Sequence, residues 1–218
     1  MLKLVLSLII SVALVQISLS SMRRSRFTEH RPFFVPPKEV VHMTFGYNES
    51  MADGLWIRVI QDIAFCGAAS MSEDGKCHMG WAYQMFDRVT DLSPHFAIVY
   101  RVGGVVLSVL ANDVEGATKI FEKGMSVFPR DWSLAYRAGY HYLYEEKDNI
   151  KAANMLKIAA MNGAPGWVSQ LSARLYADEG QIELGLKTLY EARTLHKESR
   201  WSSTIENKIK VLEERKKN

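Results

Sequence analysis

The stretch ATKIFEKGMSVFP, residues 117–129, contains a spacing that recurs along the chain. An alanine is followed four positions later by a large apolar residue, and a proline comes eight positions after that. Ala82, Phe86 and Pro94 show the same spacing 35 residues earlier. A recurrence of this length indicates an architecture built from repeated supersecondary units.

Further copies of the pattern lie downstream. Ala153 and Pro165 keep the distance of twelve residues, 36 residues after the quoted copy, with Lys157 in the aromatic position. Small residues also recur upstream of each copy at intervals of 36 and 34 residues: Gly103, Gly139 and Ala173. A looser copy without the proline contains Gly185, Leu189 and Ala192.

The residue types favour pairs of helices. Small residues let two helices cross closely, and Phe86 and Phe121 are expected to fill the space between successive pairs. Each proline ends a helix because it lacks an N–H and clashes with the preceding turn. Asn112-Asp113 and Lys147-Asp148-Asn149 are typical turn and N-cap residues. Alternating β-branched runs and Asn-Gly turns are nearly absent, so an all-α fold is predicted.

The spacing resembles that of the tetratricopeptide repeat family over residues 60–197, in three good copies and one degenerate copy. The repeats are one or two residues longer than is usual in that family, and its Trp and Leu of the first helix are often replaced. The resemblance implies an α-solenoid of three to four helix pairs. Such arrays need a polar-backed terminal helix. Residues 201–218 suit this role, with Trp201, Ile205, Ile209 and Leu212 on one stripe.

The N-terminus differs from the rest of the chain. Residues 1–22 carry one charge, Lys3, and an apolar run from Leu4 to about Ser21, which predicts a transmembrane anchor or an uncleaved signal segment. Residues 23–49 contain three prolines and are expected to form an extended linker. The repeat array is assigned to residues 50–200, before the capping helix at 201–218.

Two signals conflict on which side of the membrane the body lies. Arg23, Arg24 and Arg26 follow the apolar run, which favours a cytoplasmic body. Cys66 and Cys77 are the only cysteines, and a pair this close suits a loop-closing disulfide in an oxidising compartment, although two unrelated reduced thiols fit equally well. We expect a bacterial inner-membrane protein with a periplasmic body, and leave the cytoplasmic side open.

A narrower resemblance covers most of the chain. Gly46, Ala52, Asp53, Leu55 and Trp56, together with the turn Gly163-Ala164-Pro165, look like the sequence pattern of a group of uncharacterised bacterial membrane-anchored tetratricopeptide repeat proteins. This resemblance implies an architecture and a location but no chemistry.

The repeat resemblance also implies a binding groove. In the family, positions three before, one after and five after the small residue of the first helix line the concave face, which here gives Tyr136, Tyr140 and Tyr144. Equivalent positions in neighbouring repeats give Tyr100, Gln170 and Arg174. Tyr142 is expected to point into the helix packing instead. The alternative is that these tyrosines are covered by the chain's own N-terminal segment.

No catalytic or cofactor motif is present, and neither an enzyme nor a small-molecule substrate is expected. Cys66, Cys77 and His78 do not have the paired spacing of a structural zinc site, so no metal is predicted. The net charge of +3 is spread along the chain, which does not favour nucleic-acid binding. His141 is expected to be a hydrogen-bonded interface residue rather than a base.

The expected function is therefore that of a membrane-tethered scaffold or assembly factor of the bacterial envelope, which binds a segment of a protein partner in its groove. The alternative is a structural subunit packed permanently inside a larger membrane complex. The Lys and Asn residues that bind a free C-terminal carboxylate in some relatives are replaced by Tyr, Gly, Gln and Arg, so recognition of a free C-terminus is not supported.

Overall fold

The computed structural model describes residues 10–18, 34–69 and 80–217, and for residues 64–69 it describes the backbone alone. The chain divides into two units, Met1–Phe34 and Val35–Asn218. In the first unit residues 10–18 are helical and exposed. None of the helices described is both long enough and apolar enough to cross a membrane. The anchor predicted at 1–22 lies largely outside the described residues.

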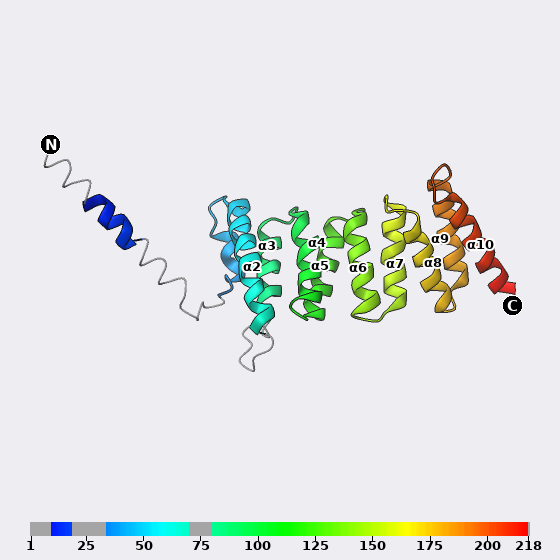
Figure 1. Cartoon of the computed structure of the whole chain (residues 1–218), viewed down its shortest axis with the longest axis horizontal. Helices are drawn as coiled ribbons and strands as arrows, with labels where there is room; N and C mark the ends of the chain where they lie inside the picture. The colour runs from blue at the N-terminus through cyan, green and yellow to red at the C-terminus, as the bar shows by residue number, and fades with distance from the viewer. Residues whose placement is uncertain (1–9, 19–33, 70–79, 218) are drawn as a thin grey trace. The chain divides into compact units, whose positions relative to one another are not determined.

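The described residues of the second unit are helices and loops without a strand, which confirms the all-α part of the predicted fold class. Its helices are shown in Figure 1: η1 (Lys38–His42, a 3-10 helix), α2 (Asn48–Ala69), α3 (Trp81–Leu92), α4 (Ala97–Val109), α5 (Val114–Val127), α6 (Trp132–Tyr144), α7 (Asn149–Met161), α8 (Trp167–Asp178), α9 (Ile182–Leu195) and α10 (Ser202–Lys217).

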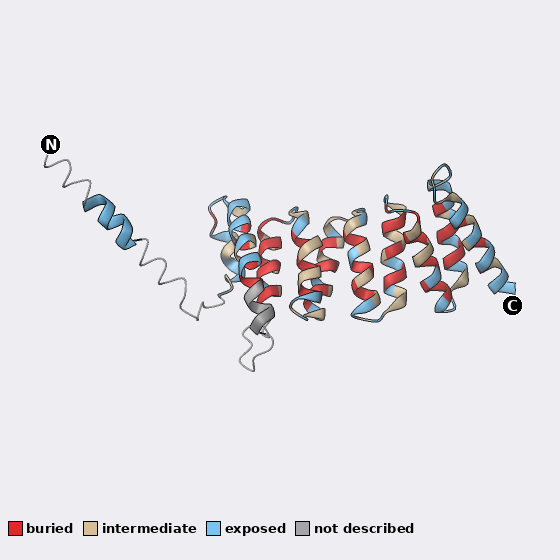
Figure 2. Ribbon diagram, in the orientation of Figure 1, coloured by how far each residue is buried: buried red, intermediate tan, exposed pale blue. Residues whose placement is uncertain are grey.

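Successive helices from α2 to α10 pack side by side (Figure 1). Helices two positions apart in sequence also meet, namely α3 with α5, α4 with α6, α7 with α9, and α8 with α10. Buried residues occur along each of these helices (Figure 2). Each helix therefore buries apolar residues against its neighbours in the row, and every extensive contact among the helices stays local in sequence.

The predicted turn residues set the helix ends. Asp113 and Asp148 are N-caps, whose carboxylates accept hydrogen bonds from the backbone N–H groups of Gly116 and Lys151, each at 2.8 Å. Such caps satisfy donors that have no partner within the helix. The helices α3, α5 and α7 end at Leu92, Val127 and Met161, shortly before the three repeat prolines.

The small residues of the repeat lie where helices approach closely. A Cβ atom on Gly139 would come within 2.8 Å of the Leu156 side chain on α7, and one on Gly103 within 3.2 Å of the Phe86 ring on α3. Phe121 lies against Gly104, where a Cβ atom would be 2.5 Å from the ring. The predicted close approach of paired helices is therefore found at Gly139, whereas the close neighbour of Gly103 is on α3 and not on α5, the helix that follows it.

The C-terminal helix covers the end of the row. Ile205, Ile209 and Leu212 of α10 are buried in a cluster with residues of α8 and α9, and the partly buried Trp201 packs on the same cluster. The apolar stripe predicted for residues 201–218 thus faces the preceding helices. At the other end, α2 begins at Asn48 rather than at 50, and residues 38–42 of the segment expected to be extended form η1.

Candidate functional site

A row of three tyrosines runs along α6. The helix begins at the N-cap Asp131, whose carboxylate accepts hydrogen bonds from the N–H groups of Ser133 and Leu134. Leu134, Ala135, Ala138, Gly139, His141 and Tyr142 are the buried residues of this helix. Side chains spaced by four residues share one face of a helix. The tyrosine row, which we define as Tyr136, Tyr140 and Tyr144, therefore lies on the face away from the core.

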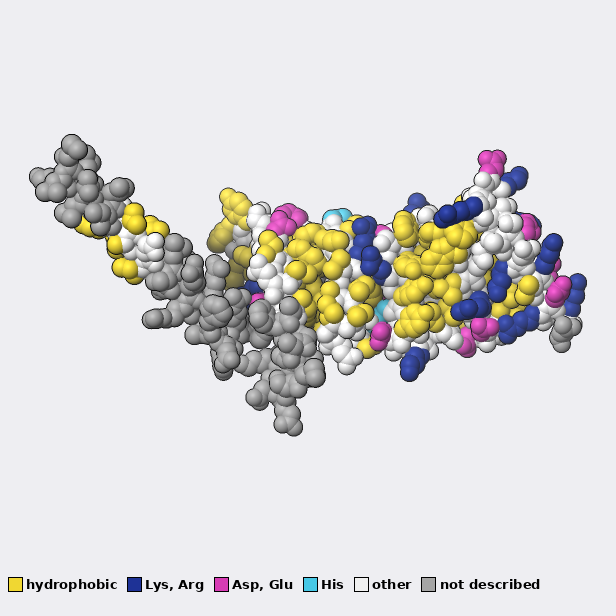
Figure 3. Space-filling model, in the orientation of Figure 1, with side chains coloured by type: hydrophobic (Ala, Val, Ile, Leu, Met, Phe, Trp, Pro, Cys, Tyr) yellow, Lys and Arg dark blue, Asp and Glu magenta, His cyan; other side chains and the backbone are white. Residues whose placement is uncertain are grey.

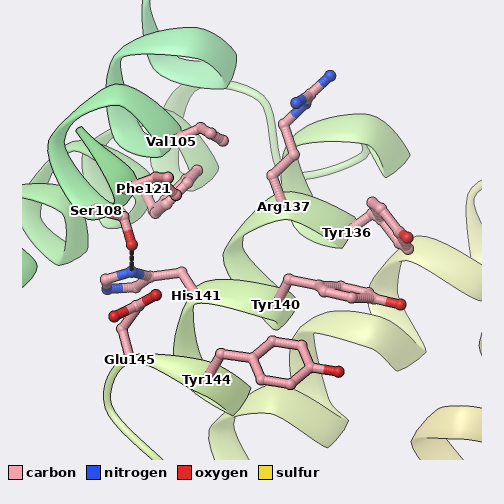
Figure 4. Close-up of a pocket in the computed structure, with 10 residues that line it drawn as sticks. Val105, Ser108, Phe121, Tyr136, Arg137, Tyr140, His141, Tyr144 and Glu145 are labelled. Carbon is pink, nitrogen blue, oxygen red and sulfur yellow. Dashed lines mark hydrogen bonds between the residues drawn. The ribbon is translucent and has the colours of Figure 1, made fainter.

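The rings of the tyrosine row are close to one another. The centroids of Tyr136 and Tyr140 are 4.7 Å apart, and those of Tyr140 and Tyr144 are 5.6 Å apart. Trp167 of α8 extends the row, since its ring meets that of Tyr136 edge to face at 5.8 Å. Figure 4 shows the three tyrosines pointing the same way from α6. The result is a continuous aromatic surface across two helices.

Exposure increases along the row. Tyr136 and Tyr140 are partly buried, whereas the side chain of Tyr144 is 63% exposed. Burial raises the pKa of the Tyr140 hydroxyl to about 12, and its hydrogen bond with Tyr136 contributes in the same direction. The Tyr140 hydroxyl therefore remains protonated at neutral pH, and it can donate or accept hydrogen bonds at the rim of an apolar surface.

A cavity of about 280 Å³ lies beside the tyrosine row, between α4 and α6. Its lining, most of which Figure 4 labels, consists of Val105, Ser108, Val109, Phe121, Tyr136, Arg137, Tyr140, His141, Tyr144 and Glu145. Most of this lining is apolar or aromatic, with Arg137 and Glu145 as its charged members. A cavity of this kind can accept an aliphatic or aromatic side chain.

A buried histidine lies at the base of the cavity. Both ring nitrogens of His141 have hydroxyl partners at 2.9 Å: Nδ1 faces Ser108 Oγ, drawn as a dashed line in Figure 4, and Nε2 faces Thr118 Oγ1. The Thr118 hydroxyl also contacts the carboxylate of Glu146, which lies 3.8 Å from Nε2. Burial lowers the pKa of His141, so the ring is neutral at pH 7.

The contacts of His141 match the sequence-based expectation of a hydrogen-bonded interface residue. In the neutral ring, Ser108 donates to Nδ1, and the N–H at Nε2 donates to Thr118. Thr118 then donates to Glu146. With both nitrogens engaged in this way, the imidazole connects α4, α5 and α6 and holds the base of the cavity.

Two arginines lie on the helices that carry the aromatic surface, and Arg137 also lines the cavity. Arg137 on α6 and Arg174 on α8 are exposed, and neither forms an ion pair with a carboxylate among the described residues. Gln170, also on α8, is partly buried, and its side-chain amide donates a hydrogen bond to Thr204 Oγ1 on α10 at 3.0 Å. The positive charge of both arginines is thus available to a ligand.

Tyr100 lies elsewhere than the repeat pattern predicted. It is fully buried, packs edge to face on Phe128, and its hydroxyl donates a hydrogen bond to the carbonyl of Pro94 at 3.1 Å. It therefore belongs to the core and not to the aromatic surface. Tyr142, by contrast, is buried as expected, with 3% of its surface exposed.

The structure adds residues that the repeat pattern did not single out, namely Arg137, Trp167 and the α4 valines 105 and 109. Trp167 precedes Arg174 by seven positions, which is two helical turns, so helical spacing alone would have placed the two on one face. No comparable signal exists for the valines, because an apolar residue on α4 fits a core position equally well.

The cysteine pair is not placed. Cys77 and the side chain of Cys66 lie outside the described residues, so their disulfide stays a prediction. Within residues 10–18, 34–63 and 80–217, no three His, Cys, Asp or Glu side chains come together as metal ligands would.

Comparisons of the chain with profiles of known families, with curated proteins and with solved structures found no match.

Proposed function

We propose that the chain is a membrane-tethered, tetratricopeptide-like α-solenoid that binds a segment of a partner protein over the tyrosine row, as a scaffold or assembly factor of the bacterial envelope. The single observation that carries the proposal is the continuous aromatic surface of Tyr136, Tyr140, Tyr144 and Trp167 beside an apolar cavity. A surface of this composition favours binding over catalysis.

Tyrosine suits such a surface for a physical reason. Its ring offers a large apolar area with few rotatable bonds, so little conformational entropy is lost on binding, and its hydroxyl can still reach a polar partner. Tyrosine, tryptophan and arginine are also the residues most enriched at the energetic centres of protein interfaces. All three residue types meet at this surface.

The chemistry of the surface favours an extended segment with one apolar anchor and nearby carboxylates. The anchor side chain would enter the cavity between α4 and α6, whose volume of about 280 Å³ suits a single side chain rather than a folded element. Arg137 and Arg174, both exposed, would pair with carboxylates of the segment. An anionic partner also agrees with the positive net charge of the chain.

A second candidate is a subunit that is packed permanently in a larger membrane complex. It is favoured by the exposed apolar residues next to the cavity, since Val109 and Leu110 are 67% and 54% exposed. Exposed apolar area of this kind is costly for a protein that exists alone. A scaffold should purify as a monomer without its partner, whereas a permanent subunit should aggregate or be lost.

Site-specific photocrosslinking in cells tests the proposal. A benzophenone amino acid at Tyr144 is expected to capture a discrete partner, and the same probe at Val211 of α10, which is 53% exposed, serves as the control position. Replacing Tyr136, Tyr140 and Arg174 by alanine should abolish the adduct at 144. An adduct that survives the triple substitution, or that also forms at 211, would contradict binding at the tyrosine row.

The location is tested separately. Reporters fused after Asn218, one active only in the periplasm and one only in the cytoplasm, are expected to report a periplasmic body. A periplasmic signal would also support the Cys66–Cys77 disulfide, which alkylation and mass spectrometry of the native protein can check. A cytoplasmic signal would move the search for the partner to the inner face of the membrane.

A further inference from the structure

Three large apolar side chains project from the loop between η1 and α2. Met43 is 63% exposed, Phe45 is 93% exposed and Tyr47 is 72% exposed. Figure 3 shows hydrophobic side chains gathered at this end of the helical unit, beside α2. A single exposed apolar residue is ordinary on a protein surface, but three at alternate positions of one loop form a patch. We call Met43, Phe45 and Tyr47 the loop triad.

The loop triad is exposed although its backbone is firmly held. Thr44, between the first two members, is buried, and its hydroxyl contacts Asn48 and the carbonyl of Val41. The N–H of Tyr47 donates to the carbonyl of Thr44 at 2.9 Å. The loop thus has one inward residue and three outward ones, so the exposure of the triad does not result from a lack of loop structure.

The backbone at the centre of the loop has a conformation that is uncommon for an aromatic residue. Phe45 has a φ of 51° and Gly46 a φ of 89°, both in the left-handed region. Residues other than glycine, asparagine and aspartate rarely occupy this region. The ring of Phe45 therefore points into solvent from an unfavourable backbone conformation, which indicates a use for it outside the folded chain.

The start of α2 is also fixed to the body. Ser93, just after α3, donates a hydrogen bond from its hydroxyl to Glu49 at 2.5 Å, and η1 contacts α3. Any surface that receives the loop triad would therefore orient the helices α2 and α3, and not only the loop.

The sequence that precedes the loop indicates which kind of surface receives the loop triad. Residues 23–42 contain five basic side chains, Arg23, Arg24, Arg26, Arg31 and Lys38, against two acidic ones, Glu29 and Glu39. The apolar run of residues 4–21 comes directly before them. From residue 22 to residue 43 a fully extended chain spans at most roughly 70 Å, so a membrane anchor at 1–22 keeps the triad within reach of the bilayer.

We propose that the loop triad docks the helical body on an anionic bilayer surface, with Phe45 and Tyr47 in the interfacial layer. Aromatic rings are favoured at this depth because they combine an apolar body with polarisability or a hydroxyl group. The basic residues before the loop complement anionic headgroups. The proposal rests on the membrane tether of the proposed function, and it adds that the body lies against the membrane in one orientation.

Lipid quenching of single added tryptophans tests the docking. The full chain carrying Phe45→Trp is reconstituted into vesicles of phosphatidylglycerol and phosphatidylcholine whose acyl chains are brominated, and its emission is compared with that of the unsubstituted chain. We expect the brominated acyl chains to quench the fluorescence that the tryptophan at position 45 adds. Tyr144→Trp, another exposed aromatic position far along the chain, is the matched control and should keep its added emission.

The outcomes separate the two proposals. If the chain floats with the vesicles and position 45 is quenched no more than position 144, the tether stands and the docking is wrong. If the chain does not float with the vesicles, the tether and the docking both fail. A third measurement is made in detergent without lipid, at increasing protein concentration. A shift to the blue in the emission of the tryptophan at position 45 would show that the triad contacts another protein molecule. That result would overturn the bilayer as the partner of the triad.

The headgroup requirement has its own readout. Vesicles of phosphatidylcholine alone should show weaker quenching at position 45 than vesicles with phosphatidylglycerol, and added salt should reduce the difference because it screens the basic residues. Equal quenching in both vesicles at all salt concentrations would contradict the role of anionic lipid.

Discussion

At the scale of single residues, the same position of the repeat holds a buried tyrosine in one copy and a partly exposed tyrosine in another. Tyr100 and Tyr136 occupy the same position of the repeat, three residues before a glycine. Tyr100 is buried because Gly124 on α5 leaves room for it, and a Cβ atom there would be 2.8 Å from the tyrosine side chain. The residue 36 positions after Gly124 is Ala160, whose methyl group is buried.

The sequence could predict which tyrosines share a face of the helix, but not how deeply each of them is buried. The spacing of four correctly placed Tyr136, Tyr140 and Tyr144 on one face of a helix. The partly exposed position of Tyr136 and the burial of Tyr100 depend on a partner residue in another helix, which spacing within one helix does not report. Gly124 and Ala160 differ in the sequence, but only the packing shows that Gly124 lies against Tyr100.

Substitution of Gly139 by alanine is expected to destabilise the protein. The added Cβ would lie 2.8 Å from Leu156 Cγ, so α6 and α7 must separate or the leucine must leave its rotamer. Overpacking of this kind costs about 1–3 kcal/mol. Gly54→Ala in α2 is the control, since a Cβ atom added at Gly54 would have no neighbour within 4 Å. It should stabilise by about 0.5–1 kcal/mol through helix propensity. Urea unfolding of the full chain in mild detergent measures both, and equal effects would contradict the close approach at Gly139.

The pKa of His141 predicts a pH dependence of stability. Burial lowers this pKa below 6.5, while the neighbouring carboxylate of Glu146 opposes the shift only in part. The unfolded chain therefore binds the proton at a higher pH than the folded chain. The stabilisation is complete above pH 6.5 and is lost as the pH falls towards the folded pKa, with a slope of at most about 1.4 kcal/mol per pH unit.

Unfolding free energies measured between about pH 7.5 and pH 5.5 check this expectation. The variant His141→Gln, which keeps hydrogen-bonding capacity at the base of the cavity, should show a flatter pH profile than the unsubstituted chain. Identical slopes would mean that His141 does not titrate differently in the two states, and that other histidines account for any pH dependence.

At the scale of helices, aspartates at the N-caps and prolines after the C-termini define the elements. These signals are local, which is why the starts of α5 and α7 at Asp113 and Asp148, and their ends before Pro129 and Pro165, could be predicted from the sequence. The segment before α2 was predicted less accurately, because η1 and the loop at Met43–Tyr47 depend on contacts of η1 with α3 and on the burial of Thr44. Proline content alone suggested an extended chain there.

The N-cap of α6 is expected to contribute to stability more than an ordinary cap. Asp131 accepts two backbone hydrogen bonds. It also accepts two from Arg101, one from Nε at 2.8 Å and one from Nη2, which fix α4 to the start of α6. Asp131→Ala should cost about 1–2 kcal/mol, and Asp131→Asn should recover most of the cap but not the charge interaction. Asp148→Ala, which removes a cap without such a bridge, is the comparison in urea unfolding. A smaller loss for Asp131→Ala than for Asp148→Ala would contradict the double role.

At the scale of the whole helical unit, the row of helices needs a cover at its end. Removal of residues 201–218 would expose Leu186, Leu189 and Ala192, which α10 now buries. We expect a loss of at least about 2 kcal/mol in the free energy of unfolding, together with self-association on a sizing column. A chain that ends after Glu214 is the control, because it keeps the apolar stripe and loses only exposed ion pairs, worth about 1 kcal/mol or less. Two equally stable truncations would contradict the covering role of α10.

The locality of the helix contacts has a consequence for how the protein is made. Every extensive contact joins elements no more than two positions apart in the chain, so the average loop that must close on folding is short. Folding rates rise as contacts become more local in sequence. On the ribosome, α2 and α3 have all their main partners once α5 has emerged, long before α10 is synthesised. The body can therefore assemble progressively as the nascent chain lengthens, with the order of synthesis serving as the order of folding.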